Sequence, residues 1–120
     1  MFGQPFVSFA EQDVALFGDA SGDRNPIHLS HDYARGAAYG QPVVFGCLGA
    51  MACLGHIHLP AGWSATSLQA EFRRPMFLGV MYRLETSEKE GKWHARLFDG
   101  SALMVWVTVT AEPSHRNESP

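Results

Sequence analysis

The strongest constraint in this sequence is an apolar stretch at residues 43–58 that has no polar face. Its large or apolar members are Val43, Val44, Phe45, Cys47, Leu48, Ala50, Met51, Ala52, Cys53 and Leu54. A helix that is apolar all round has to be buried, so the stretch predicts a central helix covered by the rest of the chain. Gly46, Gly49 and Gly55 weaken this helix but would let another backbone approach it closely. Pro60 ends it.

The second half of the chain changes to the alternation that is typical of β-strands. We expect strands at residues 64–74, 80–86, 93–98 and 101–112, with turns at residues 88–92 and at Asp99-Gly100. One buried helix and one antiparallel sheet make a two-layer α+β domain. A sheet wrapped around the central helix would cover a helix that is apolar on every side.

The first forty residues predict short helices and turns. Ser8 and Glu11 form an S-x-x-E capping box, which predicts a helix over residues 9–19. The polar segment 21–26 contains Gly and Asn-Pro and is expected to be a turn. Ser30 can cap a second short helix that runs to the next glycine.

Length and charge limit the classes of protein to which this chain can belong. The 120 residues carry nine Lys and Arg against twelve Asp and Glu, a net charge of -3, and 46% of the residues are hydrophobic. This fits one domain, which we place at residues 1–112, followed by a disordered tail at 113–120 that has no large apolar side chain. A mildly acidic chain is a poor partner for nucleic acid or an anionic membrane, because both need clustered Lys and Arg.

From the cysteines and the first ten residues we expect a cytoplasmic protein. Cys47 and Cys53 are six residues apart in the predicted helix, hence on different faces, so they cannot bridge within it. Two reduced thiols are typical of a cytoplasmic protein. No neighbouring residue in the sequence indicates that either thiol is a nucleophile, so we expect both to be unreactive. Residues 1–10 lack the features of a signal peptide, and residues 43–55 are too few to span a bilayer.

The segment that carries chemistry is residues 21–28, SGDRNPIH. Asp23 and His28 are an acid and an imidazole held close together on a loop stiffened by proline. An acid–base pair that flanks one water can add water to a double bond or remove it. The predicted central helix begins just after this segment, and its free N–H groups, with that of Gly46 unobstructed by a side chain, can bind an oxyanion. These parts together suggest enolate chemistry.

These residues resemble a known family. SGDRNPIH is similar to the signature of the MaoC-like (R)-specific enoyl-thioester hydratases, and the similarity extends over roughly residues 6–109. Further matching positions are Phe17, Tyr33-Ala34, Tyr39-Gly40-Gln41-Pro42-Val43-Val44, Gly46, Phe72-Arg73-Arg74-Pro75 and Gly79. The resemblance implies a hot-dog fold, in which an antiparallel sheet wraps a long central helix, usually in a homodimer.

The resemblance also implies roles for individual residues. Asp23 and His28 would be the catalytic pair that holds the water, Gly46 would supply the oxyanion N–H, and Asn25 would orient the loop. The substrate would be an acyl thioester of coenzyme A or of an acyl carrier protein in fatty-acid or polyketide metabolism. We expect no cofactor and no metal.

The sequence departs from the family pattern at three places. Phe45 stands where the family often has His, Leu54-Gly55 where it often has a polar residue, and Gly79-Val80 where it has Gly-Asp. These changes would make the site drier and reshape the acyl pocket. Candidates to line that pocket are Phe45, Met51, Trp63 and Phe72. Arg73 and Arg74 are either contacts for a carrier phosphate or a solvated strand edge.

Several alternatives stay open from the sequence. A hot-dog domain can bind an acyl thioester without catalysis or serve as a scaffold, and in that case Asp23 would be tied up in a salt bridge, for instance with Arg24. The same pair could add a hydroxyl of the acyl chain instead of water and close a ring. Thioester hydrolysis is disfavoured because residues 50–54 supply no acid. The His28-x-x-His31 and His56-x-His58 spacings lack companion metal ligands.

Overall fold

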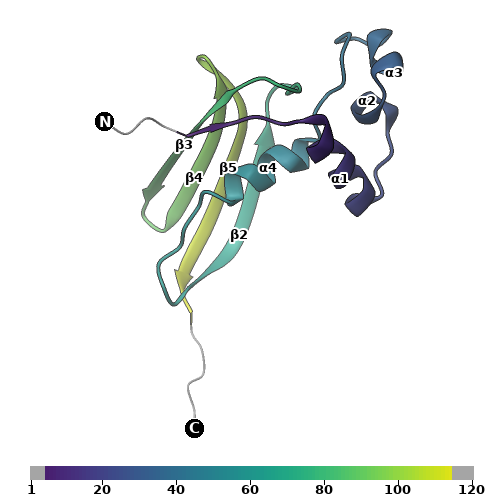
Figure 1. Ribbon diagram of the computed structural model, residues 1–120. Coiled ribbons are helices and arrows are strands. Elements are labelled where there is room, and N and C mark those ends of the chain that lie inside the picture. The colour runs from purple at the N-terminus through teal and green to yellow at the C-terminus, as the bar shows by residue number, and fades with distance from the viewer. Residues whose placement is uncertain (1–4, 115–120) are drawn as a thin grey trace.

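A computed structural model describes residues 5–114 (Figure 1). The elements follow the order helix-rich first half, then sheet. They are β1 (Phe6–Val7), α1 (Glu11–Ser21), α2 (Pro26–Leu29), α3 (His31–Arg35), α4 (Gly46–Leu54), β2 (Trp63–Phe72), β3 (Tyr82–Lys89), β4 (Lys92–Asp99) and β5 (Ala102–Pro113). The four long strands predicted from the alternation are confirmed, while the short strand β1 and the single-turn helix α2 were not foreseen.

The sheet is antiparallel, with strand order β1-β3-β4-β5-β2. Strands β3, β4 and β5 are joined by tight hairpins, and their buried side chains alternate with polar ones, as the pattern predicts. The core on the inner face of the sheet is formed by Tyr82, Leu84, Ala95, Leu97, Val105 and Val107. Strand β2 lies at the edge, so it has only β5 as a neighbour.

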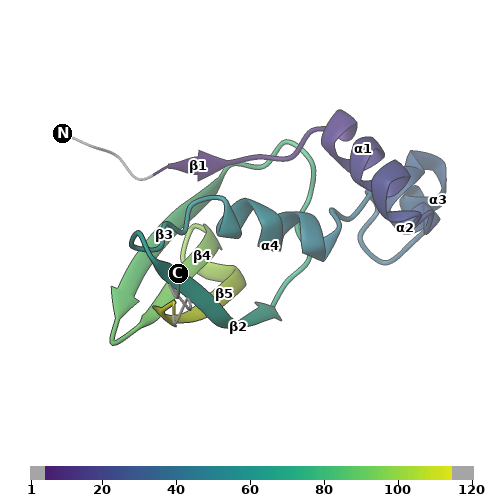
Figure 2. The same cartoon turned by 90° about the horizontal axis from the view of Figure 1, so that it is seen from below.

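Helix α4 lies across the inner face of the sheet, on β5 and β4 (Figure 2). The prediction that it is buried on every side is wrong for the single chain. Cys53 and Gly49 are buried against the sheet, whereas Cys47 is exposed and Met51 is 55% exposed on the opposite side. The sheet covers one side of α4 and does not close around the other.

Helix α4 is also shorter than the apolar stretch that predicts it. At its start, Val43 forms a β-bridge with Phe77, and the Val44 N–H donates to the Met76 carbonyl (2.8 Å). These pairings hold the chain extended, so the helix begins only at Gly46. We expected the glycines of α4 to allow another backbone to approach the helix closely. This is wrong for Gly46 and Gly49, because the atoms closest to them belong to side chains.

Helices α1, α2 and α3 cluster beyond the N-terminal end of α4, at one end of the sheet (Figures 1 and 2). The predicted Ser8 cap of the first helix is wrong. The N-cap is Ala10, whose N–H donates to the Asp13 carboxylate (2.8 Å). The Ser30 cap is confirmed, because its hydroxyl accepts the Tyr33 N–H (3.1 Å).

At the C-terminal end, β5 continues through Pro113, which pairs with Trp63 of β2. The first residue of the predicted tail therefore belongs to the sheet, and residues 115–120 of that tail lie outside the described part of the chain. Within residues 5–114, no helix is long and apolar enough to cross a membrane.

Candidate active site

The signature segment is folded by its own side chains. One oxygen of the Asp23 carboxylate, Oδ1, accepts the Asn25 N–H (3.1 Å), and the Asn25 side chain accepts the Ile27 N–H (3.1 Å). Asn25 thereby caps α2, and Pro26 occupies the first helical position, where its missing N–H has no cost. The orienting function expected of Asn25 has this structural basis: it begins the helical turn that carries His28.

His28 is tied to the residues that precede α4. Its ring nitrogen Nδ1 lies 2.6 Å from the Val43 carbonyl oxygen, and the Val43 N–H donates to the Ile27 carbonyl (3.0 Å). A carbonyl oxygen can only accept, so Nδ1 carries the proton in this contact. In the neutral imidazole, Nε2 then keeps a free lone pair that can accept a hydrogen bond.

Phe45 supports the His28 ring. The two rings stack with centroids 4.1 Å apart and planes at 29°, and Phe17 packs on Phe45 at 4.9 Å. Phe45 is buried. Phe45, which stands where the family pattern often has histidine, therefore packs against the ring of His28. It does not line the pocket that contains His28 and Gly46.

A pocket of about 440 Å³ joins the signature segment to the start of α4 and the end of β2. His28, Gly46, Arg73, Arg74 and Phe72 line it, together with Ile27, Tyr39, Val43, Val44, Pro75, Met76 and Val105. The structure thus brings His28 and Gly46 into one cavity. Gly46 opens the helix, where N–H groups have no intrahelical acceptor.

The structure places the other predicted site residues elsewhere. Asp23 is exposed on the loop before α2 and does not line the pocket. Of the four candidates for an acyl pocket, Phe72 lines the cavity. Met51 lies on the exposed side of α4, and Trp63 lies at the far end of β2 from Phe72, against Trp93 (ring centroids 5.7 Å apart).

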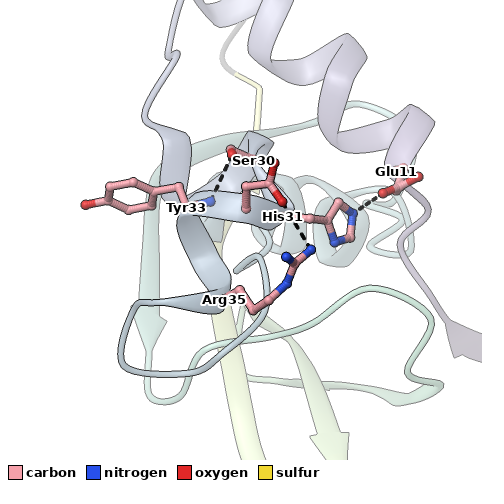
Figure 3. A network of polar contacts seen from close by, with 6 residues as sticks. Glu11, Ser30, His31, Tyr33 and Arg35 are labelled. Carbon is pink, nitrogen blue, oxygen red and sulfur yellow. Dashed lines mark hydrogen bonds and ion pairs between the residues drawn. The ribbon is translucent and has the colours of Figure 1, made fainter.

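His28 also borders a second, smaller cleft of about 150 Å³. Glu11 from α1 and His31 from α3 line this cleft and are hydrogen-bonded to each other (Figure 3). Within α3, Arg35 pairs with Asp32 (3.2 Å). The contact between Glu11 and His31 connects the first and third helices. In the described part of the chain, no three His, Cys, Asp or Glu side chains are grouped so that they could hold a metal ion.

The two cysteines are free. Burial raises the pKa of the Cys53 thiol to about 12, so it stays protonated and unreactive at neutral pH. Cys47 is exposed on α4.

Solved structures share this arrangement of sheet and helix. An (R)-hydratase from A. caviae involved in PHA biosynthesis is 26% identical, with a TM-score of 0.73 over 93% of each chain. The R-hydratase PhaJ1 from Pseudomonas aeruginosa is 27% identical, with a TM-score of 0.69 over 98% of this chain and 86% of that one. The HadBC (3R-hydroxyacyl-ACP dehydratase) complex from Mycobacterium tuberculosis is 12% identical and shares the fold, with a TM-score of 0.68 over 90% of each chain. No curated protein matches the sequence.

The sheet and helix therefore define a hot-dog domain, as the resemblance implies. The model of the MaoC-like domain family matches residues 3–105. The chain belongs to the MaoC-like dehydratase family.

The Asn25 cap yields a direct prediction. Asn25→Ala removes the acceptor for the Ile27 N–H and should lower the free energy of unfolding by about 1 kcal/mol, measured by urea denaturation. Asn25→Asp keeps an acceptor oxygen at the same place and should lower the free energy of unfolding much less. An equal loss in both variants would contradict the capping role.

Proposed function

We propose that the protein catalyses (R)-specific hydration of a 2-enoyl thioester and the reverse dehydration of a 3-hydroxyacyl thioester. The observation that carries this proposal is that His28, held with a free Nε2, and Gly46, at the start of α4, line one pocket. The family and the (R)-hydratases of similar fold support the reaction class. We place the reaction in the cytoplasm, where Cys47 and Cys53 would stay reduced.

In the proposed mechanism, the thioester carbonyl accepts the Gly46 N–H, which stabilises the enolate oxygen as it develops. His28 Nε2 and the Asp23 carboxylate hold the water. The water oxygen bonds to Cβ while one of its protons passes to Asp23. With assistance from His28, that proton is then delivered from Asp23 to Cα, so Asp23 returns to its carboxylate form. The product has gained one hydroxyl and one hydrogen across the former double bond, and dehydration reverses each step.

The surroundings of Asp23 support a catalytic role over a scaffold. A scaffold would tie Asp23 in a salt bridge with its neighbour Arg24. Arg24 instead pairs with Asp19 (2.8 Å). The Asp23 oxygen Oδ1 accepts the Asn25 N–H, so Oδ2 remains to take a proton. The mechanism requires Oδ2 to reach the water on the His28 side of the pocket.

Substitution of the pair tests the proposal. Asp23→Asn and His28→Asn should each lower kcat by about 10²–10⁴-fold, measured as loss of the conjugated absorbance of crotonyl-CoA. Asp23→Asn keeps the size of the side chain, and His28→Asn keeps an N–H group that can donate to the Val43 carbonyl. The matched controls Asp19→Asn and His58→Ala should keep wild-type rates. A wild-type protein that hydrates no enoyl thioester on either carrier would refute the function.

We further propose that Arg74 binds a phosphate of the substrate's carrier, coenzyme A or acyl carrier protein. Arg74 lines the pocket beside Gly46 and His28. Among the arginines of residues 5–114, the others each form an ion pair or face an aromatic ring, and Arg74 does neither. A guanidinium free at the edge of a pocket suits a phosphate group.

Arg74→Gln should raise KM for crotonyl-CoA roughly tenfold, since a hydrogen bond to a charged group is lost, with little change in kcat. The crotonyl thioester of N-acetylcysteamine has no phosphate, and its KM should not change. Arg24→Gln removes an exposed, paired arginine and serves as the control. A rise in KM of the same size for both thioesters would exclude phosphate binding.

We propose that the active form is a homodimer. The side of α4 that the sheet leaves open carries Cys47 and Met51. The inner face of the edge strand β2 adds Leu68, 54% exposed, and Phe72, 52% exposed. Leu68 pairs with buried Val109, which places it on the inner face. An apolar strip of this kind beside an unpaired strand edge favours association with a second copy.

Leu68→Glu should convert the dimer to a monomer, because association would bury an unpaired charge; sedimentation equilibrium measures the mass. Gln69→Glu introduces the same charge on the outer face of the same strand and should leave the dimer intact. A wild-type chain that sediments as a monomer, or a Leu68→Glu variant that remains dimeric, would overturn the proposed interface.

A further inference from the structure

Met76 forms a wedge between α4 and the sheet. Its side chain is buried, with 2% exposed, and its terminal methyl group lies over Gly49 in the middle of α4. A side-chain carbon built on Gly49 would lie 2.3 Å from the Met76 methyl carbon Cε and 3.4 Å from Val105 Cγ2 of β5. The Met76 methyl group thus occupies the space that a side chain at position 49 would need, between the helix and the strand beneath it.

The segment that carries Met76 is fixed at several points. The Met76 carbonyl accepts the Val44 N–H (2.8 Å), and the neighbouring Phe77 N–H donates to the hydroxyl of buried Tyr82 (2.7 Å). Phe77 also forms a β-bridge with Val43. The backbone at Met76 is therefore held, while its unbranched side chain remains adaptable.

Met76 and Val105 belong to the wall of the pocket that contains His28 and Gly46. Gly49 follows Gly46 by three residues, so its backbone, over which the Met76 methyl lies, is about 4.5 Å farther along the helix axis than that of Gly46. A thioester whose carbonyl is bound at Gly46 and whose acyl chain runs along α4 would meet this methyl group.

We propose that Met76 closes the acyl end of the pocket and restricts the protein to short acyl chains. The proposal rests on the proposed function for the identity of the ligand. Met76 is a specificity-determining residue and takes no part in proton transfer. Its contact with Gly49 makes the two positions a coupled pair: shortening Met76 opens space toward the helix, and a methyl group at position 49 pushes the end of Met76 toward the pocket.

The experiment compares Met76→Ala, Gly49→Ala and the double variant with the wild type on crotonyl-, hexenoyl-, octenoyl- and dodecenoyl-CoA. Met76→Ala should raise kcat/KM for octenoyl-CoA relative to crotonyl-CoA roughly tenfold or more, because acyl methylenes gain an apolar site. Gly49→Ala should lower the same ratio. The double variant should return toward the wild-type ratio, since the alanine methyl partly refills the space.

Leu84→Ala is the matched control for lost core volume. Leu84 is as deeply buried as Met76 but belongs to β3 and does not line the pocket, so its truncation should destabilise the protein without altering the ratio. Affinity for saturated butyryl- and octanoyl-CoA, measured by titration calorimetry, is the second readout, because binding needs no catalysis.

The two readouts separate failure of this inference from failure of the proposed function. Hydration with an unchanged chain-length ratio in Met76→Ala would overturn the role of Met76. Absence of hydration together with the expected shift in affinity would support Met76 as the closing residue of an acyl site while refuting the catalytic function. A shift of the same size in Leu84→Ala would also overturn the inference.

Discussion

Two hydrogen bonds at Val43 hold the candidate site together. Its N–H donates to the Ile27 carbonyl and its carbonyl accepts from His28, so both backbone polar groups of this residue join the signature segment to the chain before α4. The bridge from Val43 to Phe77 then adds the segment that contains Met76. Each such bond contributes only about 1 kcal/mol net, yet together they bring three parts of the chain that are distant in sequence to one pocket. The position of the imidazole relative to the start of α4 depends on them.

The sheet was predictable because the alternation of apolar and polar residues along a strand indicates directly which side chains face the core. The two hairpins that join β3, β4 and β5 were also predictable, because their turns contain glycine. In the structure Glu90, Gly91 and Gly100 adopt the left-handed conformation that such turns require. The start of α4 was not predictable. Val43 and Val44 continue the apolar pattern of the helix, but backbone pairing with residues 76–77 and the contacts of Val43 with residues 27–28 hold them extended. Helix α2 was missed because Asn-Pro reads as a turn, while the Asn25 side chain makes it a helix cap.

The residues of the candidate site likewise fall into those that the sequence could indicate and those that it could not. Asp23 and His28 could be proposed because they lie at fixed offsets in a local motif, and Gly46 because it lies in the apolar stretch that predicts the central helix and matches a glycine of the family pattern. Tyr39, Met76 and Val105 could not, because they reach the pocket from three separate segments. Met51 and Trp63 were expected in the pocket on the grounds of size and apolarity. Neither property tells which side of a helix or which end of a strand a residue occupies, and the structure places both elsewhere.

Helices α2 and α3 contain four and five residues, far fewer than a helix needs to be stable by itself in water. Their order derives from the side-chain caps at Asn25 and Ser30, the contacts at Val43 and the pair between Glu11 and His31. The sheet, by contrast, has continuous backbone pairing and a buried core. The segment that carries His28 is thus expected to be locally less stable than the sheet and to open while the sheet stays folded. Amide protons of residues 23–35 would then exchange with solvent long before those of β4 and β5, and a ligand in the pocket would slow that exchange.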